Sequence, residues 1–215
     1  MKHTLKYGLL AASALALAAS AQAQGYVNGD LLVGFTGGSS DFIYDLGQPS
    51  SLTSGQTWTI GSSLGTQFGV VGSQQTGKHI FATSFDSVNE NNYLPAGLWA
   101  NARADITTIA QGVTVGLSRT TTSTDTTGWA YQTAQPPGTP GNTFQNDFFN
   151  PNVSVSTTAY LYDNLNTGSV IPDGMFTYNS ANGVLTYAVP EPSTFSLFAG
   201  FGLLALSLRR RLAKA

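Results

Sequence analysis

The sequence offers one histidine for base chemistry outside its N-terminal leader, His79 in the run Lys78-His79-Ile80. A Ser-His-Asp hydrolase needs a group that accepts a proton near neutral pH, and His79 is the candidate for that role. Its place at the start of a predicted strand is more typical of a surface or edge-strand histidine. We therefore assign it no catalytic role.

Carboxylates are a second route to catalysis, because secreted sugar hydrolases use a pair of them. Asp41 and Asp45 stand four residues apart in a predicted strand, which places both on one face, and we expect them to be solvated. Glu90 lies among asparagines and is more typical of a polar turn. A polysaccharide hydrolase is the least favoured of the functions considered.

Metal ligands are equally sparse in the sequence. Asp163 and Asn166, followed by Gly168, offer oxygen ligands that suit Ca²⁺, but the glutamate that ends an EF-hand loop is missing. The pattern favours a turn over a calcium site, and we predict no metal and no cofactor. Because the chain has no cysteine, disulfides, thiol nucleophiles and zinc knuckles are excluded.

The aromatic residues allow a binding function instead. Trp58, Trp99 and Trp129, with many Tyr, Asn and Gln side chains, are the residue types from which sugar-binding platforms are built. Trp58 and Trp129 are the candidate ligand-binding residues, and their use requires exposed ring faces. A carbohydrate-binding module is therefore an alternative function.

The formal net charge of −2 is an average over three unlike regions. Residues 24–188 carry three basic and ten acidic side chains, a net charge of −7, while both ends of the chain are positive. A body of this charge lacks the basic surface that binds phosphate backbones, so we exclude nucleic acid as a partner.

The first 23 residues have the order of a secretory signal peptide. Lys2 and Lys6 precede an apolar run at residues 8–19, and Ala21 and Ala23 then form a small-residue cleavage box. The apolar run is shorter than the roughly 20 residues that a membrane-spanning helix needs. We predict removal of residues 1–23 by signal peptidase, leaving Gln24 as the first residue.

The C-terminal region, residues 189–215, contains a second targeting pattern. Pro190-Glu191-Pro192 is followed by an apolar run at residues 195–208 and then by Arg209, Arg210 and Arg211. A cluster of arginines after an apolar run predicts a short transmembrane helix whose end stays in the cytoplasm. The two prolines keep the preceding segment extended, which is the form a protease can bind.

This tail resembles the PEP-CTERM sorting domain of exported bacterial proteins. The resemblance implies that exosortase, a membrane-embedded transpeptidase, recognises Pro190, Glu191 and Pro192. It further implies that residues 195–208 anchor the protein in the inner membrane before processing, and that Arg209–Arg211 are the retention signal. The body that would be delivered has no assigned activity.

Residues 24–188 predict one mainly β domain, an antiparallel sandwich with one or two helices. Apolar stretches predict strands at residues 31–35, 42–46, 57–60, 80–85 and 153–162. Trp99, Ala102, Ile106, Ile109 and Val113 recur at helical spacing within residues 95–113, which predicts a helix packed on the sheet.

Residues 176–188 predict a hairpin, because Asn182-Gly183 suits a two-residue type I′ turn. That turn would pair Tyr178 with Tyr187. Residues 133–152 contain a proline-rich stretch and predict a long loop.

The function favoured by the sequence is that of an exported, non-enzymatic protein of the cell envelope or exopolysaccharide matrix. Its expected partners are signal peptidase, an exosortase-like transpeptidase, the inner membrane and exopolysaccharide. Retention of the tail as a permanent inner-membrane anchor is an open alternative to its removal.

Overall fold

The computed structural model describes residues 26–85, 99–133, 151–165 and 170–189. The strands are β1 Leu31–Thr36, β2 Ser40–Gly47, β3 Thr57–Thr59, β4 Gln67–Gln74, β5 His79–Ser84, β6 Ser118–Thr122, β7 Val153–Ser154, β8 Ala159–Leu165, β9 Val170–Asn179 and β10 Val184–Ala188. The helices are α2 Trp99–Ile109 and α3 Trp129–Thr133, with a 3-10 turn, η1, at Pro49–Ser51. The predicted mainly β class with helices is confirmed.

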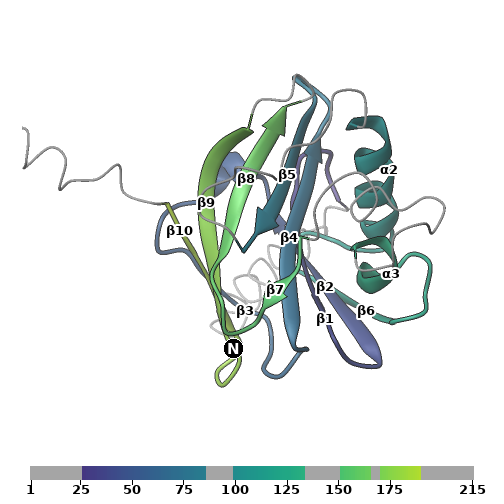
Figure 1. Ribbon diagram of the computed structural model, residues 1–215, viewed down its shortest axis with the longest axis vertical. Helices are drawn as coiled ribbons and strands as arrows, with labels where there is room; N and C mark the ends of the chain where they lie inside the picture. The colour runs from purple at the N-terminus through teal and green to yellow at the C-terminus, as the bar shows by residue number, and fades with distance from the viewer. Residues whose placement is uncertain (1–25, 86–98, 134–150, 166–169, 190–215) are drawn as a thin grey trace, which may run out of the picture.

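All of these strands belong to one antiparallel sheet of order β3-β10-β9-β8-β5-β4-β1-β2-β6, with β7 paired to β4. Figure 1 shows the sheet curled, with α2 and α3 against one of its faces. The predicted antiparallel arrangement is therefore confirmed, but the sandwich is one continuous curled sheet. Strand pairing runs unbroken from β3 to β6, so the two facing layers belong to the same sheet.

The inner face of the curled sheet holds the larger hydrophobic core. Phe35 of β1 and Tyr178 of β9 are separated in the sheet by β4, β5 and β8, yet their ring centroids lie 4.6 Å apart. Phe68 stacks on Phe35 with its ring centroid at 5.7 Å. Phe68 is the register partner of Phe35 on the neighbouring strand, whereas the contact with Tyr178 crosses the interior. Aromatic rings bury large apolar areas, so the contact across the interior stabilises the curl.

The outer face is covered by the two helices. The predicted helical stripe is confirmed, since Trp99, Ala102, Ile106 and Ile109 of α2 are buried in a second core, with Val113 just beyond the helix. Trp129 of α3 belongs to the same core. Over the ranges that the structure describes, we find no helix long and apolar enough to cross a membrane. The predicted transmembrane helix at 195–208, the signal peptide and most of the predicted loop at 133–152 lie outside those ranges.

Residues 153–162, predicted as a single strand, form parts of β7 and β8 separated by a turn. The amide of Thr157 donates to the carbonyl oxygen of Ser154 at 2.8 Å and closes this turn. Val153, Ala159 and Leu161 are buried together in the inner core, so the predicted face is correct. The interruption lets β7 pair with β4 and β8 pair with β5.

The hairpin of β9 and β10 is present, but its predicted register is wrong by two residues. Tyr187 pairs with Phe176, and Tyr178 pairs with Leu185. Only Gly183 of the Asn-Gly pair has a positive φ, of 70°, whereas a type I′ turn requires positive φ at both positions. The side-chain oxygen of Asn179 instead accepts from the amides of Ala181 and Asn182, which stabilises a four-residue loop.

Candidate functional site

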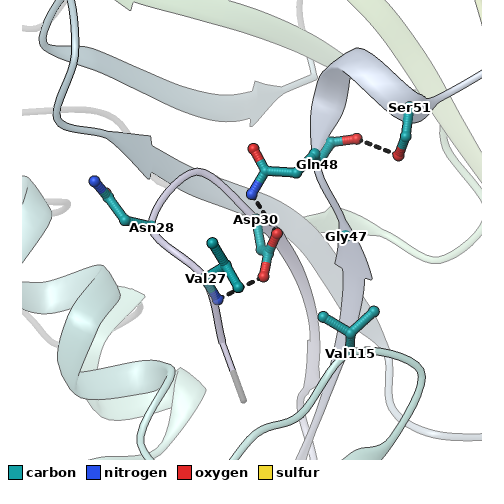
Figure 2. A pocket seen from close by; sticks show the side chains of 7 residues that line it. All are labelled: Val27, Asn28, Asp30, Gly47, Gln48, Ser51 and Val115. Carbon is teal, nitrogen blue, oxygen red and sulfur yellow. Dashed lines mark hydrogen bonds between the residues drawn. The ribbon is translucent and has the colours of Figure 1, made fainter. Parts of the chain in front are cut away.

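An open pocket of about 360 Å³ lies where the N-terminal segment meets the end of β2 (Figure 2). Its polar side chains come from Asn28, Asp30, Gln48 and Ser51. The remaining lining residues are Val27, Gly47 and Val115. Both valines are partly exposed, so the pocket combines apolar walls with hydrogen-bonding groups. Such a combination is typical of small-ligand sites.

Asp30 is the charged group of this pocket, although its side chain is only 2 % exposed. Its carboxylate accepts hydrogen bonds from the amide of Val27 at 2.6 Å and from Nε2 of Gln48 at 2.5 Å. Gly29, with a φ of 111°, lies under the Gln48 amide, and a Cβ there would stand 2.7 Å from Oε1. Figure 2 shows the hydrogen bonds that join Asp30 to Val27 and Gln48, so that Asp30 fixes the Gln48 side chain.

Asp45 precedes the pocket-lining Gly47 by two residues and is 1 % exposed, so the expectation that it is solvated is wrong. Its Oδ1 accepts from the amide of Gly47 at 2.9 Å, while Oδ2 has no hydrogen-bond partner among the described residues. Burial, with a smaller contribution from the charge of Asp30, raises the pKa of Asp45 to about 6, and the hydrogen bond from Gly47 opposes this rise. The segment around Val115 lies beside this end of β2, because Val115 forms a β-bridge with Asp45.

Asp41 is also buried, which corrects the second half of that expectation. Its Oδ2 accepts from the amide of Ala130 at 2.6 Å, in the first turn of α3. Burial raises the pKa of Asp41, while hydrogen bonds to its carboxylate, first that from Ala130, lower it. Asp41 and Asp45 share one face of β2 as predicted, but they serve separate structural contacts.

His79 is paired with a carboxylate that the sequence reasoning did not connect to it. Its Nδ1 lies 2.7 Å from Oδ2 of Asp163, and its ring stacks on Phe81 at a centroid distance of 6.1 Å. The partners are 84 residues apart in sequence and meet because β5 pairs with β8. Burial raises the pKa of nearby Asp173, and the charge of Asp163 adds to this effect. The pair can orient an imidazole as a base.

A serine motif that the sequence reasoning overlooked does not complete this pair. Gly61-Ser62-Ser63-Leu64-Gly65 fits the Gly-x-Ser-x-Gly pattern of many hydrolases, and Ser63 has a strained φ of 57°. Ser63 precedes β4 and His79 follows it. The eight residues of β4 span about 26 Å at the usual strand rise, so the motif and His79 lie at opposite ends of the strand.

The tryptophans do not form an exposed platform. Trp129 is fully buried, its Nε1 donates to Oδ1 of Asn152 at 2.6 Å, and its expected exposure is therefore wrong. Trp99 is also buried and donates to the carbonyl oxygen of His79 at 3.3 Å. Trp58 is half-buried against Phe176, with ring centroids 6.3 Å apart. No cluster of three or more potential metal-ligating side chains occurs in the part of the chain that the structure describes.

The sorting motif begins where the folded domain ends. Ala188 is the last residue of β10, and the exposed Val189 donates its amide hydrogen to Oγ of Ser54 at 3.3 Å. A family model described as "PEP-CTERM protein-sorting motif" matches residues 188–211. The chain carries a PEP-CTERM sorting motif.

The PEP-CTERM motif indicates an exported protein with a C-terminal sorting tail and implies exosortase as its processing partner. The sorting-motif residues Pro190, Glu191 and Pro192 and the cluster Arg209, Arg210 and Arg211 fall within this match but outside the described residues. The signal-cleavage residues Ala21 and Ala23 also lie outside the described residues. No curated protein and no solved structure matches the chain.

Proposed function

We propose that this chain is a non-enzymatic protein of the cell envelope or exopolysaccharide matrix, processed at both ends. Signal peptidase removes residues 1–23 after Ala23. The apolar run at 195–208 then holds the protein in the inner membrane until the exosortase-like enzyme acts at Pro190-Glu191-Pro192. The observation that carries the proposal is the match at residues 188–211, which starts at the last residue of β10. Removal of the tail therefore leaves the sheet intact.

The roles of the buried polar groups support a non-enzymatic body. Asp41 holds the start of α3, and Asp45 holds the turn at Gly47. The His79–Asp163 pair lies far along β4 from the strained Ser63, so these groups do not assemble into a nucleophile and base. The contacts of Asp41 and Asp45 thus hold local elements of the fold.

The intact mass of the protein recovered from cells that carry exosortase tests this proposal. We expect loss of residues 1–23 and of the tail including Arg209–Arg211. Replacing Glu191 by alanine should leave the tail attached, while Ser193→Ala, just outside the tripeptide, should be processed normally. A mature protein that keeps its arginine cluster would identify a permanent anchor, and an uncut protein in the cytosol would exclude export.

Binding of a polyhydroxyl ligand, such as one sugar unit of an exopolysaccharide, is a second candidate function. The observation that favours it is the convergence of Asp30, Gln48 and Ser51 on the open pocket. Gln48→Ala should then weaken binding of exopolysaccharide fragments. Gln75→Ala, an exposed glutamine hydrogen-bonded to Arg103, should leave it unchanged. Calorimetric titrations that show no heat with any fragment would reject this candidate.

A further inference from the structure

The C-terminal half of β10 is hydrogen-bonded on both of its edges. On one side it follows β9 as far as the pair Ala188–Met175. On the other side β10 pairs with the two residues that precede β3. The amide of Gly55 donates to the carbonyl oxygen of Tyr187, and the amide of Tyr187 donates to the carbonyl oxygen of Gln56, both at 2.9 Å. The strand that leads into the sorting motif is therefore fully paired up to its end.

Tyr187 fixes this end of the strand in the inner core. Its side chain is 3 % exposed, and its hydroxyl donates to the carbonyl oxygen of Asp173 at 2.9 Å. The ring lies over Gly174, where a Cβ would stand 2.3 Å from it, and packs on Phe176 at a centroid distance of 5.1 Å. Peeling the strand back past Tyr187 would open the core, so unpairing stops there.

Only Ala188 and Val189 separate this fixed residue from Pro190. The Val189 amide bonds to Oγ of Ser54, which joins the residue before the motif to the loop between η1 and β3. Proline has no amide hydrogen, so Pro190 cannot extend the pairing. The Ser54 contact is thus the last hydrogen bond between the domain and its tail within the described residues.

We propose that the Ser54–Val189 hydrogen bond is a latch that limits exosortase processing, and that Ala188 and Val189 must leave the sheet edge before the motif is bound. This inference rests on the proposed function. Enzymes and domains that bind extended peptides use the main-chain hydrogen-bonding groups of the peptide. Here those groups are occupied by β9 and by Ser54 until the end of β10 frays.

The latch predicts that a longer or looser junction is processed faster. A Gly-Ser-Gly-Ser insertion between Val189 and Pro190 of the full chain lets the motif be bound while Ala188 and Val189 keep their hydrogen bonds to the domain. Because those bonds, each of typical net strength, no longer have to break, the rate of tail loss should rise by about fivefold or more. Ser54→Ala should raise the rate by about threefold, the effect of one such bond. Ser54→Thr keeps the hydroxyl and should behave as the wild type.

The rates are measured by pulse-chase labelling in cells that carry exosortase, with mass analysis of the C-terminus. The same insertion between Gly38 and Ser39, in the exposed β1–β2 turn, is the matched control and should leave the rate unchanged. Equal rates of tail loss in the wild type, Ser54→Ala and the spacer variant would overturn the latch while leaving exosortase processing in place. Retention of the tail in every variant would overturn the proposed function and the latch with it.

Discussion

At the scale of single residues, the environment of Asp45 makes its charge costly. The side chain is 1 % exposed, and one of its two oxygens accepts no hydrogen bond from the described residues. Burial raises the pKa of Asp45 from 3.8 to about 6. The folded protein therefore holds this proton more tightly than the unfolded chain does. The contribution of Asp45 to stability is therefore fully present below the ordinary pKa, and it is lost as the pH rises through the pKa of the folded protein.

Asp45→Asn is expected to remove this pH dependence, because the amide keeps an oxygen for the Gly47 amide and carries no charge. The measured quantity is the free energy of unfolding of the variant minus that of the wild type. This difference should be larger at pH 7 than at pH 4 by about 1–3 kcal/mol. Urea unfolding of residues 24–188 at the two pH values measures the difference. An advantage that does not vary with pH would contradict the raised pKa.

Asp125→Asn is the control of opposite sign. Hydrogen bonds from the amide and hydroxyl of Thr127 lower the pKa of Asp125, so its charged form stabilises the fold above the ordinary pKa and this contribution is lost as the pH falls. The variant should therefore be less stable than the wild type at pH 7 and approach it in acid.

At the scale of the elements, the sequence predicts what depends on local spacing. The helical stripe of α2 and the strands β1, β2 and β5 follow from apolar periodicity, which is a property of neighbouring residues. The burial of Asp41 and Asp45 does not follow from local spacing, because the segments packed beside them, α3 for Asp41 and the residues around Val115 for Asp45, lie far along the chain. The spacing placed both on the right face of β2 but contained no information about what covers that face.

The hairpin and the candidate site show the same limit. The turn predicted at Asn182-Gly183 shifts the register by two residues from the observed one. Because side chains alternate between the two faces of a strand, a shift of two residues leaves Tyr178 and Tyr187 facing the inner core. The Asp30 pocket and the His79–Asp163 pair were missed because each joins segments brought together only by the sheet. The buried position of Trp129 depends on Gly34, and no local pattern links these two residues.

The packing of α3 on the sheet depends on the lack of a side chain at Gly34. A Cβ on Gly34 would stand 1.8 Å from the indole of Trp129, so Gly34→Ala must displace the helix. We expect a loss of about 3 kcal/mol in the free energy of unfolding, as for other overpacked cores, with a red shift of tryptophan emission. Gly38→Ala has open space around the added carbon and should be neutral in both measurements. Equal stability of the two variants would show that α3 is not seated on Gly34.

At the scale of the whole molecule, the curl of the sheet brings distant strands into one cooperative core. β1 and β9 share no backbone hydrogen bonds, because β4, β5 and β8 lie between them in the sheet. Their contact therefore depends only on side chains that meet across the interior. Phe35 and Tyr178 make the shortest of these aromatic contacts, in an edge-to-face arrangement with a 62° angle between the rings.

A double-mutant cycle on this pair tests the curl directly. Phe35→Leu and Tyr178→Leu should each destabilise the domain, and their coupling free energy should be about 0.5–1.5 kcal/mol, as for other aromatic pairs in contact. Tyr178→Phe separates the ring contact from the hydrogen bond that its hydroxyl donates to the carbonyl oxygen of Gly61.

The control cycle combines Phe35→Leu with Ile106→Val, since Ile106 lies in the core on the other face of the sheet. Those two effects should add to within about 0.5 kcal/mol. Urea unfolding of the four proteins in each cycle gives the coupling. If Phe35 and Tyr178 were no more coupled than the control pair, the inner faces of β1 and β9 would not be in contact, and the sheet would be open in solution.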